Sequence, residues 1–238
     1  ARGAGVHLAF FSGNEVFWKT RWEPSIDGSG TPHRTLVSYK ETHAGAKVDP
    51  LPGVWTGTWR DPRAFNPEGP QPENALTGTI FTVNCCSYPL TVPAEDGKLR
   101  FWRDTSVATL LPGQTATLGP ETLGHEWDED LDNGARPPGL VRLSTTTVAV
   151  PQRVLDHGST YGPGVATHHM TLYRHASGAL VFGAGTIQWP WGLDDQHDRG
   201  NAPADPRMQQ ATLNLLADMG VLPGTLQAGL VLAAPSAD

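Results

Sequence analysis

Two polar side chains, far apart in the sequence, have the residue type and setting of a site that holds a ligand or moves a proton. Asn14 directly follows the apolar run "HLAFFSG", where its amide can donate and accept hydrogen bonds toward a cleft or can cap a following helix. Glu126 stands between His125 and Trp127 in "GHEWD", and burial beside an aromatic ring raises a carboxyl pKa and suits the group to proton transfer. We therefore take Asn14 and Glu126 as candidate catalytic residues.

Histidine and tryptophan side chains supply candidate substrate-binding positions. His168 and His169 begin a predicted strand, where neighbouring residues point to opposite faces, so at most one faces a pocket and a two-histidine metal site is not expected. Trp189 and Trp191 flank a proline and can line a small-molecule pocket or a sugar platform, with core packing as the alternative. The candidate substrate-binding residues are His125, His168, Trp189 and Trp191, and no residue is assigned as a metal ligand.

Two further clusters are interpreted without a chemical role. The acidic stretch 123–139 lacks the spacing of an EF-hand loop, so we expect a solvated acidic loop. The adjacent residues Cys85 and Cys86 are expected to be two small residues at a strand end, because a disulfide between neighbours strains the peptide that joins them. The sequence also lacks a serine-hydrolase elbow, a zinc-protease motif, a phosphate-binding loop and a dinucleotide fingerprint.

Composition narrows the class of protein. The 238 residues are 38% hydrophobic and 17% charged, as is typical of a globular protein with a sizeable core. The net charge is −7 and the basic residues are scattered, so nucleic acid is not expected as a partner. No apolar run approaches the roughly 20 residues that span a bilayer, and the first residues lack the pattern of a signal peptide.

Segments rich in β-branched and aromatic residues predict strands. The first of them is apolar on both faces, which is typical of a central strand that helices cover on both sides of a parallel sheet. Segment 141–150 alternates apolar and polar residues, which favours a half-exposed antiparallel element and therefore a mixed sheet. The predicted strands span residues 6–11, 35–40, 79–83, 141–150, 170–173 and 179–182.

Two helices are predicted among long loops rich in proline and glycine. Residues 206–219 follow an N-capping aspartate, start with a proline and stop at a glycine. Residues 13–22 form the second, which makes Glu15 a helix-start carboxylate that the helix dipole stabilises. We expect a single α/β domain over residues 1–224 and a linker-like tail over residues 225–238.

Several separate stretches, in the same order, resemble a known family. The C-terminal domain of the large (beta) subunit of N,N-dimethylformamidase, with its actinobacterial relatives, is the family that they resemble. The likeness runs from residue 5 to about residue 220. The stretches that carry it are "GVHLAFFSGNEVFWKTRW", "PENALTGTIFTVN", "LGHEWDEDLDNG" followed by "RPPGL", and "MTLYRHASGALVFGAGTIQWPWGLD".

The resemblance implies a three-layer α/β fold similar to class I glutamine amidotransferases, with a flavodoxin-like sheet, an antiparallel extension and first elements that this chain lacks. It also implies iron, held by two tyrosines and a glutamate, that polarises an amide carbonyl and activates water. The glutamate belongs to a Gly-His-x-Glu-Tyr-Trp segment that this chain does not contain, so the iron ligands are expected outside it. Asn14 matches the family's strand-end asparagine near the metal, and Glu126 matches a carboxylate that faces the same cleft.

Two functions from different classes follow from this resemblance. The first is metal-assisted hydrolysis of a small amide, completed by an upstream segment or a companion chain. The second is a non-catalytic module of a secreted multidomain protein that binds carbohydrate or another ligand through Trp189 and Trp191. An extracellular location is favoured, with a cytoplasmic location as the alternative.

Overall fold

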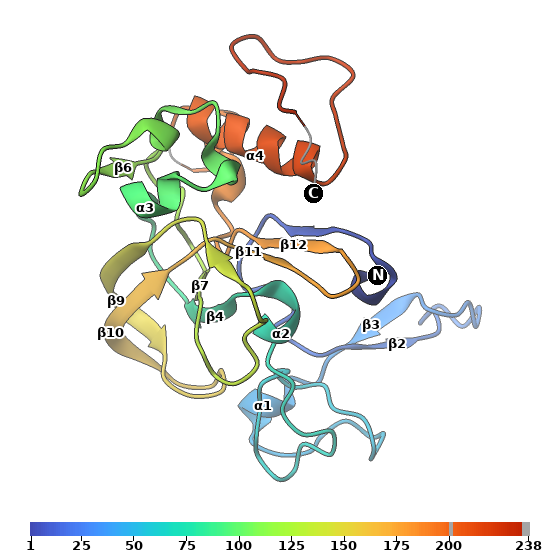
Figure 1. Ribbon diagram of the computed structural model, residues 1–238. Helices are drawn as coiled ribbons and strands as arrows, with labels where there is room; N and C mark the ends of the chain where they lie inside the picture. The colour runs from blue at the N-terminus through green and yellow to red at the C-terminus, as the bar shows by residue number, and fades with distance from the viewer. Residues whose placement is uncertain (200–201, 235–238) are drawn as a thin grey trace.

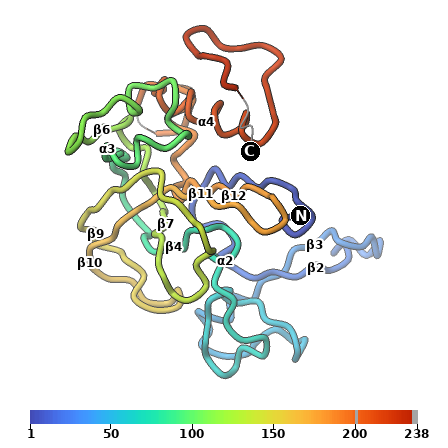
Figure 2. The backbone as a smooth tube through the Cα atoms, in the orientation of Figure 1, coloured from blue at the N-terminus to red at the C-terminus, as the bar shows by residue number. Residues whose placement is uncertain are grey.

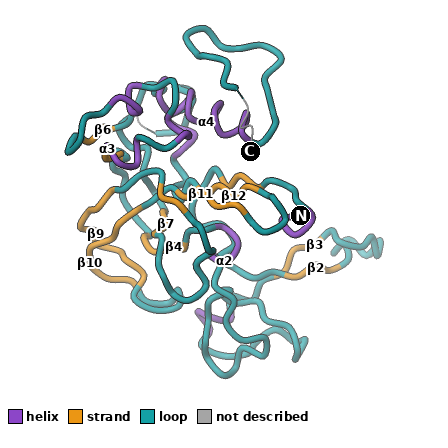
Figure 3. Tube along the Cα trace, in the orientation of Figure 1, coloured by secondary structure: helices purple, strands orange, loops and turns teal. Residues whose placement is uncertain are grey.

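Short strands joined by long loops make up most of the protein, which has a mixed α/β fold with few helices (Figure 1; Figure 3). The computed structural model describes residues 1–199 and 202–234. The strands are β1 (Leu8–Phe10), β2 (Arg21–Glu23), β3 (Thr35–Val37), β4 (Ile80–Val83), β5 (Thr91–Pro93), β6 (Thr115–Thr117), β7 (Trp127–Glu129), β8 (Val141–Arg142), β9 (Thr146–Val154), β10 (Tyr161–His168), β11 (Thr171–Arg174) and β12 (Leu180–Gly183). The α-helices are α1 (Glu41–Ala44), α2 (Asn74–Thr77), α3 (Ala94–Gly97) and α4 (Pro206–Asp218), and the 3-10 helices are η1 (Arg2–Ala4), η2 (Arg100–Trp102), η3 (Ser106–Thr109) and η4 (Trp189–Gly192).

A four-stranded sheet in the order β1-β12-β11-β8 carries the first strand of the chain. β1 pairs in parallel with β12, whereas β11 pairs antiparallel with both β12 and β8, so the predicted mixed sheet is confirmed. The expectation that the first strand is central and covered on both faces is wrong for the described residues. β1 lies at the edge of this sheet, and all three of its residues are only half-buried.

Four other strands, in the order β10-β7-β4-β9, close into a small barrel. β9 and β10 form a long antiparallel hairpin, which lies beside β4 and β7 in Figure 1. The predicted strand 141–150 is therefore two strands. Between them, Leu143 donates its backbone N–H to the Met170 carbonyl, and Ser144 accepts the N–H of Met170, as the chain passes from the sheet to the barrel.

One large apolar cluster joins the sheet, the barrel and α4. Trp127 from the barrel, Phe182 from the sheet and Met208 from α4 are all fully buried in it. The predicted helix 206–219 is confirmed as α4, because Asp205 caps it by accepting the backbone N–H of Arg207. Apolar residues at helical spacing then turn one face of α4 into this core.

The predicted helix 13–22 is wrong. Its first residues form a turn in which Asn14 and Val16 have left-handed backbone conformations, with φ of 55° and 58°. Phe17 is then buried edge-on against Phe81, with ring centroids 5.0 Å apart, and the chain continues into β2. Tertiary packing of this aromatic, β-branched segment therefore overrides a helix pattern that no capping bond supports.

The β2–β3 hairpin projects from the remainder of the protein, and the C-terminal residues follow a long loop past α4 (Figure 2). The end of this loop returns to the helix, because Gln210 exchanges two hydrogen bonds with the backbone of Val231, at 2.8 and 2.9 Å. The described part of the predicted tail thus contacts the domain. In the described ranges, no helix has the length and apolar character of a membrane span.

Candidate functional site

The turn that follows β1 lies in close contact with the segment that leads into β7. A Cβ atom on Gly13 would lie 3.0 Å from the carbonyl oxygen of Glu126 and 3.0 Å from the amide nitrogen of Thr186, so the close approach requires glycine. The next residue, Asn14, donates its backbone N–H to Asp128 Oδ1 over 2.9 Å. These contacts fix the place of Asn14 at the end of the strand.

Asn14 and Glu126, the two candidate catalytic residues, are in direct contact. Asn14 Nδ2 donates a hydrogen bond of 2.9 Å to Glu126 Oε2, and Glu126 is partly exposed. Asn14 Oδ1 is buried and receives no hydrogen bond from the described residues. The pair therefore presents an unused amide oxygen and a carboxylate at one place, although 112 residues separate the two side chains in sequence.

Asp128 is the buried carboxylate that contacts the backbone of Asn14. Its side chain is buried, Oδ1 accepts the Asn14 N–H, and Oδ2 accepts the Thr79 hydroxyl over 2.8 Å. Burial raises the pKa of the Asp128 carboxyl to about 6, because the two hydrogen bonds only partly offset the loss of water and Glu73 adds a neighbouring negative charge. Asp128 was not singled out from the sequence, since the acidic stretch around it was expected to be solvated.

Glu15 is the functional candidate that the sequence interpretation missed. There is no helix for it to start, and its carboxyl forms no hydrogen bond or ion pair within the described residues. Burial, together with the charge of Asp128, raises the pKa of the Glu15 carboxyl to about 7. A carboxyl that titrates near neutral pH can both take up and release a proton. The signal that could have identified it is its position directly after Asn14 at a strand end.

The expectation of a solvated acidic loop over residues 123–139 is wrong for three consecutive residues. Asp128, Glu129 and Asp130 are all buried, because β7 belongs to the barrel. Glu129 pairs with Arg153 on β9 at 2.8 Å, and Asp130 lies between two arginines, Arg136 and Arg142, at 2.7 and 2.8 Å. Each carboxylate therefore has a specific partner.

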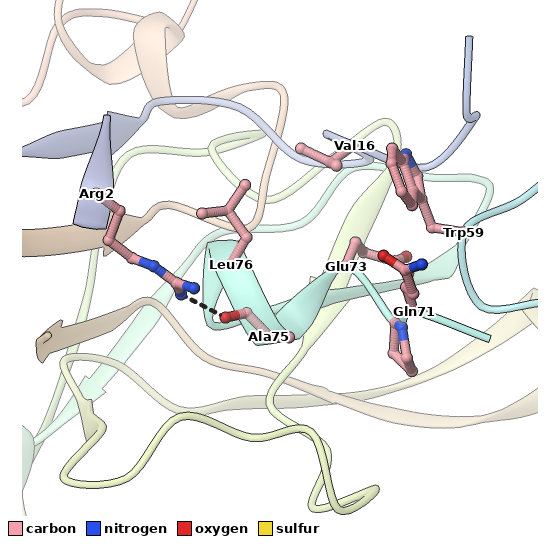
Figure 4. Close-up of a pocket in the computed structure, with 8 residues that line it drawn as sticks. Arg2, Val16, Trp59, Gln71, Glu73, Ala75 and Leu76 are labelled. Carbon is pink, nitrogen blue, oxygen red and sulfur yellow. Dashed lines mark hydrogen bonds between the residues drawn. The ribbon is translucent and has the colours of Figure 1, made fainter. Parts of the chain in front are cut away.

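A cavity of about 220 Å³ lies beside the turn that carries Asn14. Figure 4 shows Val16 and Trp59 at one end of it, Arg2 at the other end, and Glu73 between them. Glu73 is buried and forms an ion pair with Arg60, whose Nη1 also donates to the Phe81 carbonyl over 2.7 Å. The charges of Arg60 and Glu73 also act on Asp128. The charged side chains beside the cavity therefore influence the carboxylate that contacts Asn14.

The candidate substrate-binding residues do not gather around this site. His125 is exposed and adjoins Glu126 in the chain. His168 is fully buried, and its Nε2 donates a hydrogen bond of 2.9 Å to the Ala184 carbonyl. Burial lowers the pKa of His168 to about 3, so the imidazole stays neutral and cannot contact a solvent-borne substrate. Its other ring nitrogen, Nδ1, has no partner among the described residues.

The expected tryptophan platform is also wrong, and the alternative of core packing holds. Trp189 is 0% exposed and packs near Phe182 and Phe101 in the main core. Trp191 is 9% exposed and stacks on His197, with ring centroids 4.5 Å apart. Both lie in the 3-10 helix η4, which turns its aromatic rings inward.

The described residues contain no group of three or more His, Cys, Asp or Glu side chains placed to hold a metal ion. The Asn14 amide and the Glu126 carboxylate are bonded to each other instead. Cys85 and Cys86 are paired as a disulfide between neighbouring residues, which corrects the expectation of two unlinked side chains.

The sequence matches one described family over most of its length. The family described as N,N-dimethylformamidase beta subunit-like, C-terminal, matches residues 1–202. No curated protein matches the sequence. With 202 of 238 residues covered, including Asn14, Glu15, Glu126 and Asp128, the chain belongs to the N,N-dimethylformamidase beta subunit-like, C-terminal family.

Proposed function

We propose that the protein hydrolyses a small linear amide at the site formed by Asn14, Glu15 and Glu126, above Asp128. The observation that carries the proposal is the 2.9 Å hydrogen bond from Asn14 Nδ2 to Glu126 Oε2, beside a glutamate whose carboxyl pKa is raised to about 7. Membership of the dimethylformamidase-like family supports an amide as the substrate class.

Each side chain has a task that its surroundings suit. Glu15, as a carboxylate, takes a proton from the water that attacks the amide carbon, and it returns this proton to the departing amine when the carbon–nitrogen bond breaks. Glu126 holds the Asn14 amide with Oε2, while Oε1, which has no hydrogen-bond partner in the described residues, accepts from the substrate N–H or from water. Asn14 Oδ1 is buried and has no hydrogen-bond partner among the described residues, so we assign Asn14 the task of holding Glu126 in place.

Asp128 acts through its neighbours in this scheme. It anchors the backbone of Asn14, and its negative charge keeps the pKa of Glu15 high. A proton carrier works best when its pKa lies near the working pH, so Asp128 tunes Glu15 for proton transfer near neutrality. We regard Asp128 as a positioning residue because its carboxyl is buried beneath the site.

Iron is part of the proposal through the family resemblance alone. It would act as a Lewis acid on the amide carbonyl, and its ligands would come from a segment or chain other than these residues. The outer edge of β1 supports such an addition, because within the described residues its half-buried apolar residues pair with β12 on one side only. The three-layer, glutamine amidotransferase-like sheet belongs to the same proposal, with the β1-β12-β11-β8 sheet as part of it.

The rival function, a carbohydrate-binding module, has no observation in its favour. It depended on Trp189 and Trp191 as an exposed platform, and both rings are buried. The proposal of amide hydrolysis is the one that the arrangement around Asn14 supports.

Release of amine or ammonia from formamide, acetamide and N,N-dimethylformamide by the full-length protein, with any co-purified companion chain, tests this function. Glu126→Gln and Asn14→Ala are expected to lower the rate about 100-fold. Glu95→Gln, at an exposed position on α3, is the matched control and is expected to retain the wild-type rate. Full activity of Glu126→Gln, or no release from any of the three amides by the wild type, would contradict the proposal.

A further inference from the structure

A second cavity, of about 330 Å³, adjoins the first at Arg2. Arg2 and Ala75 line both cavities. Figure 4 shows the hydrogen bond that joins the Arg2 guanidinium to the Ala75 carbonyl. The second cavity is further lined by Tyr173, by a turn containing two prolines, and by basic side chains. No acidic residue is among its described lining residues, although the protein as a whole has a net charge of −7.

Arg2 is fixed in a way that leaves part of its guanidinium unused. Nη1 donates to the Ala75 carbonyl over 2.6 Å and to the Tyr173 hydroxyl over 2.8 Å. The Tyr173 hydroxyl in turn donates to the Leu76 carbonyl over 2.6 Å, so the contact point is itself anchored. Nε and Nη2 have no acceptor among the described residues, and Arg2 forms no ion pair with any described carboxylate.

This geometry presents one edge of a planar donor group. The Nε and Nη2 hydrogens of arginine lie parallel and match the two oxygens of a carboxylate or phosphate. Because the opposite edge is already held by two acceptors, the guanidinium loses little freedom when an anion binds to the free edge.

The other wall of the cavity adds positive charge. Arg136 lines it, and it shares the buried carboxylate of Asp130 with Arg142. The charge of Asp132 also acts on Arg136, and Arg2, which lines the same cavity, forms no ion pair with a described carboxylate. Arg174 and His175 also contribute to the lining.

We propose that this second cavity binds a small organic anion, whose carboxylate or phosphate group occupies the free Nε and Nη2 edge of Arg2. The apolar faces of Tyr173, Pro137 and Pro138 bound the space that the rest of the ligand would fill. The site lies apart from the Asn14 and Glu126 pair and does not depend on the proposed hydrolysis.

Isothermal titration calorimetry of the full chain with inorganic phosphate and with succinate, in buffers of matched ionic strength, tests the proposal. Wild-type protein is expected to show one saturable site for at least one of the two probes. Binding of phosphate alone identifies a phosphate group as the ligand chemistry, and binding of succinate alone identifies a carboxylate. Saturable binding of neither probe would overturn the proposal.

Two variants at Arg2 and one matched control locate the site. Arg2→Met is expected to weaken binding at least about tenfold, because it removes a charge and its paired donors. Arg2→Lys keeps the charge without the planar donor edge and is expected to be intermediate, which separates paired recognition from simple attraction. Arg34→Met removes an exposed arginine near β3 and is expected to bind like the wild type. Equal affinity of the wild type, Arg2→Met and Arg2→Lys proteins, each folded by circular dichroism, would place the anion elsewhere and overturn the proposal.

Discussion

Asn14 and Glu126 are joined by a hydrogen bond of 2.9 Å between the turn that follows β1 and the residue that precedes β7. Two residues after Glu126, Asp128 accepts the backbone N–H of the same asparagine, also over 2.9 Å. Side chains two residues apart on an extended chain point to the same side, which is how one short segment holds both the amide and the backbone of Asn14. The asparagine is thus clamped by two carboxylates of different burial, one partly exposed and one enclosed.

The backbone of Asn14 predicts how its substitutions differ in stability. Both Asn14→Gly and Asn14→Ala remove the hydrogen bond to Glu126, but only alanine opposes the left-handed φ of 55°. We expect Asn14→Ala to lower the free energy of unfolding by about 1 kcal/mol more than Asn14→Gly does. Urea denaturation of the two variants measures this difference, and equal stabilities would show that the turn is not held in this conformation.

The proximity of Asp128 predicts a coupled titration. Asp128→Asn keeps an oxygen that can accept the Asn14 N–H but removes the negative charge that raises the pKa of Glu15. The pKa of the Glu15 carboxyl, about 7 in the wild type, is therefore expected to fall, while burial keeps it above that of an ordinary glutamate. Carboxyl carbon NMR of labelled protein measures it. Asp132→Asn, at an exposed position, serves as the control, and a Glu15 pKa that stays the same in both variants would refute the coupling.

The buried His168 predicts a loss of stability in acid. Its pKa is lowered to about 3 in the folded state, so the unfolded state binds the proton more readily, and the stabilisation present above pH 6.5 is lost as the pH falls toward 3. The loss through His168 approaches about 1.4 kcal/mol per pH unit over this window. Glu15 and Asp128 have raised pKa values and act in the opposite direction, so the comparison must be made between variants.

His168→Gln isolates this contribution, because glutamine can still donate to the Ala184 carbonyl but does not titrate. We expect unfolding free energies measured by urea denaturation between pH 7 and pH 4 to fall less steeply in His168→Gln than in the wild type. His33→Gln, at an exposed position, should match the wild-type slope. A slope in His168→Gln identical to that of the wild type would mean that His168 is not buried in its neutral form.

The place of Trp189 predicts a structural and not a binding phenotype. Trp189→Ala empties a fully buried part of the main core and is expected to cost about 3–5 kcal/mol of stability. Trp22→Ala, on the projecting β2–β3 hairpin where the ring is 59% exposed, is expected to change stability by less than about 0.5 kcal/mol. Chemical denaturation of the two variants provides the measurement, and a mild effect of Trp189→Ala would contradict its assignment to the core.

Secondary structure could be predicted from the sequence where local helix or strand preference and core packing favour the same conformation. α4 could be predicted because a capping aspartate, an initial proline and apolar spacing all point to the same helix. The family resemblance assigned Asn14 and Glu126 to one cleft but did not predict the hydrogen bond between them, since nothing in the spacing of two residues so far apart fixes one. Residues 13–22 show the opposite case, because the burial of Phe17 against Phe81 decides their conformation and is invisible in a helical pattern.

Burial of the acidic side chains in β7 and directly after it could not be predicted from the sequence. A run of acidic residues is solvated on most proteins, whereas here Asp130 is enclosed by Arg136 and Arg142, which follow it within 12 residues, and Glu129 is matched by Arg153 from another strand. The pKa of Glu15 is raised by burial and then by the charge of Asp128, a residue 113 positions away in the sequence. Ion-pair partners that come from another strand, such as Arg153 for Glu129, can be identified only once the pairing of the strands is known.

The pH dependence of amide hydrolysis by the full-length protein and its Glu15→Gln variant tests the proposed site most directly. If Glu15 carries the proton, kcat/KM of the wild type should fall below an apparent pKa of about 7 as its carboxylate is protonated. In Glu15→Gln the remaining rate should be at least about 100-fold lower and should show no inflection near pH 7. The same inflection and a comparable rate in Glu15→Gln would contradict the account.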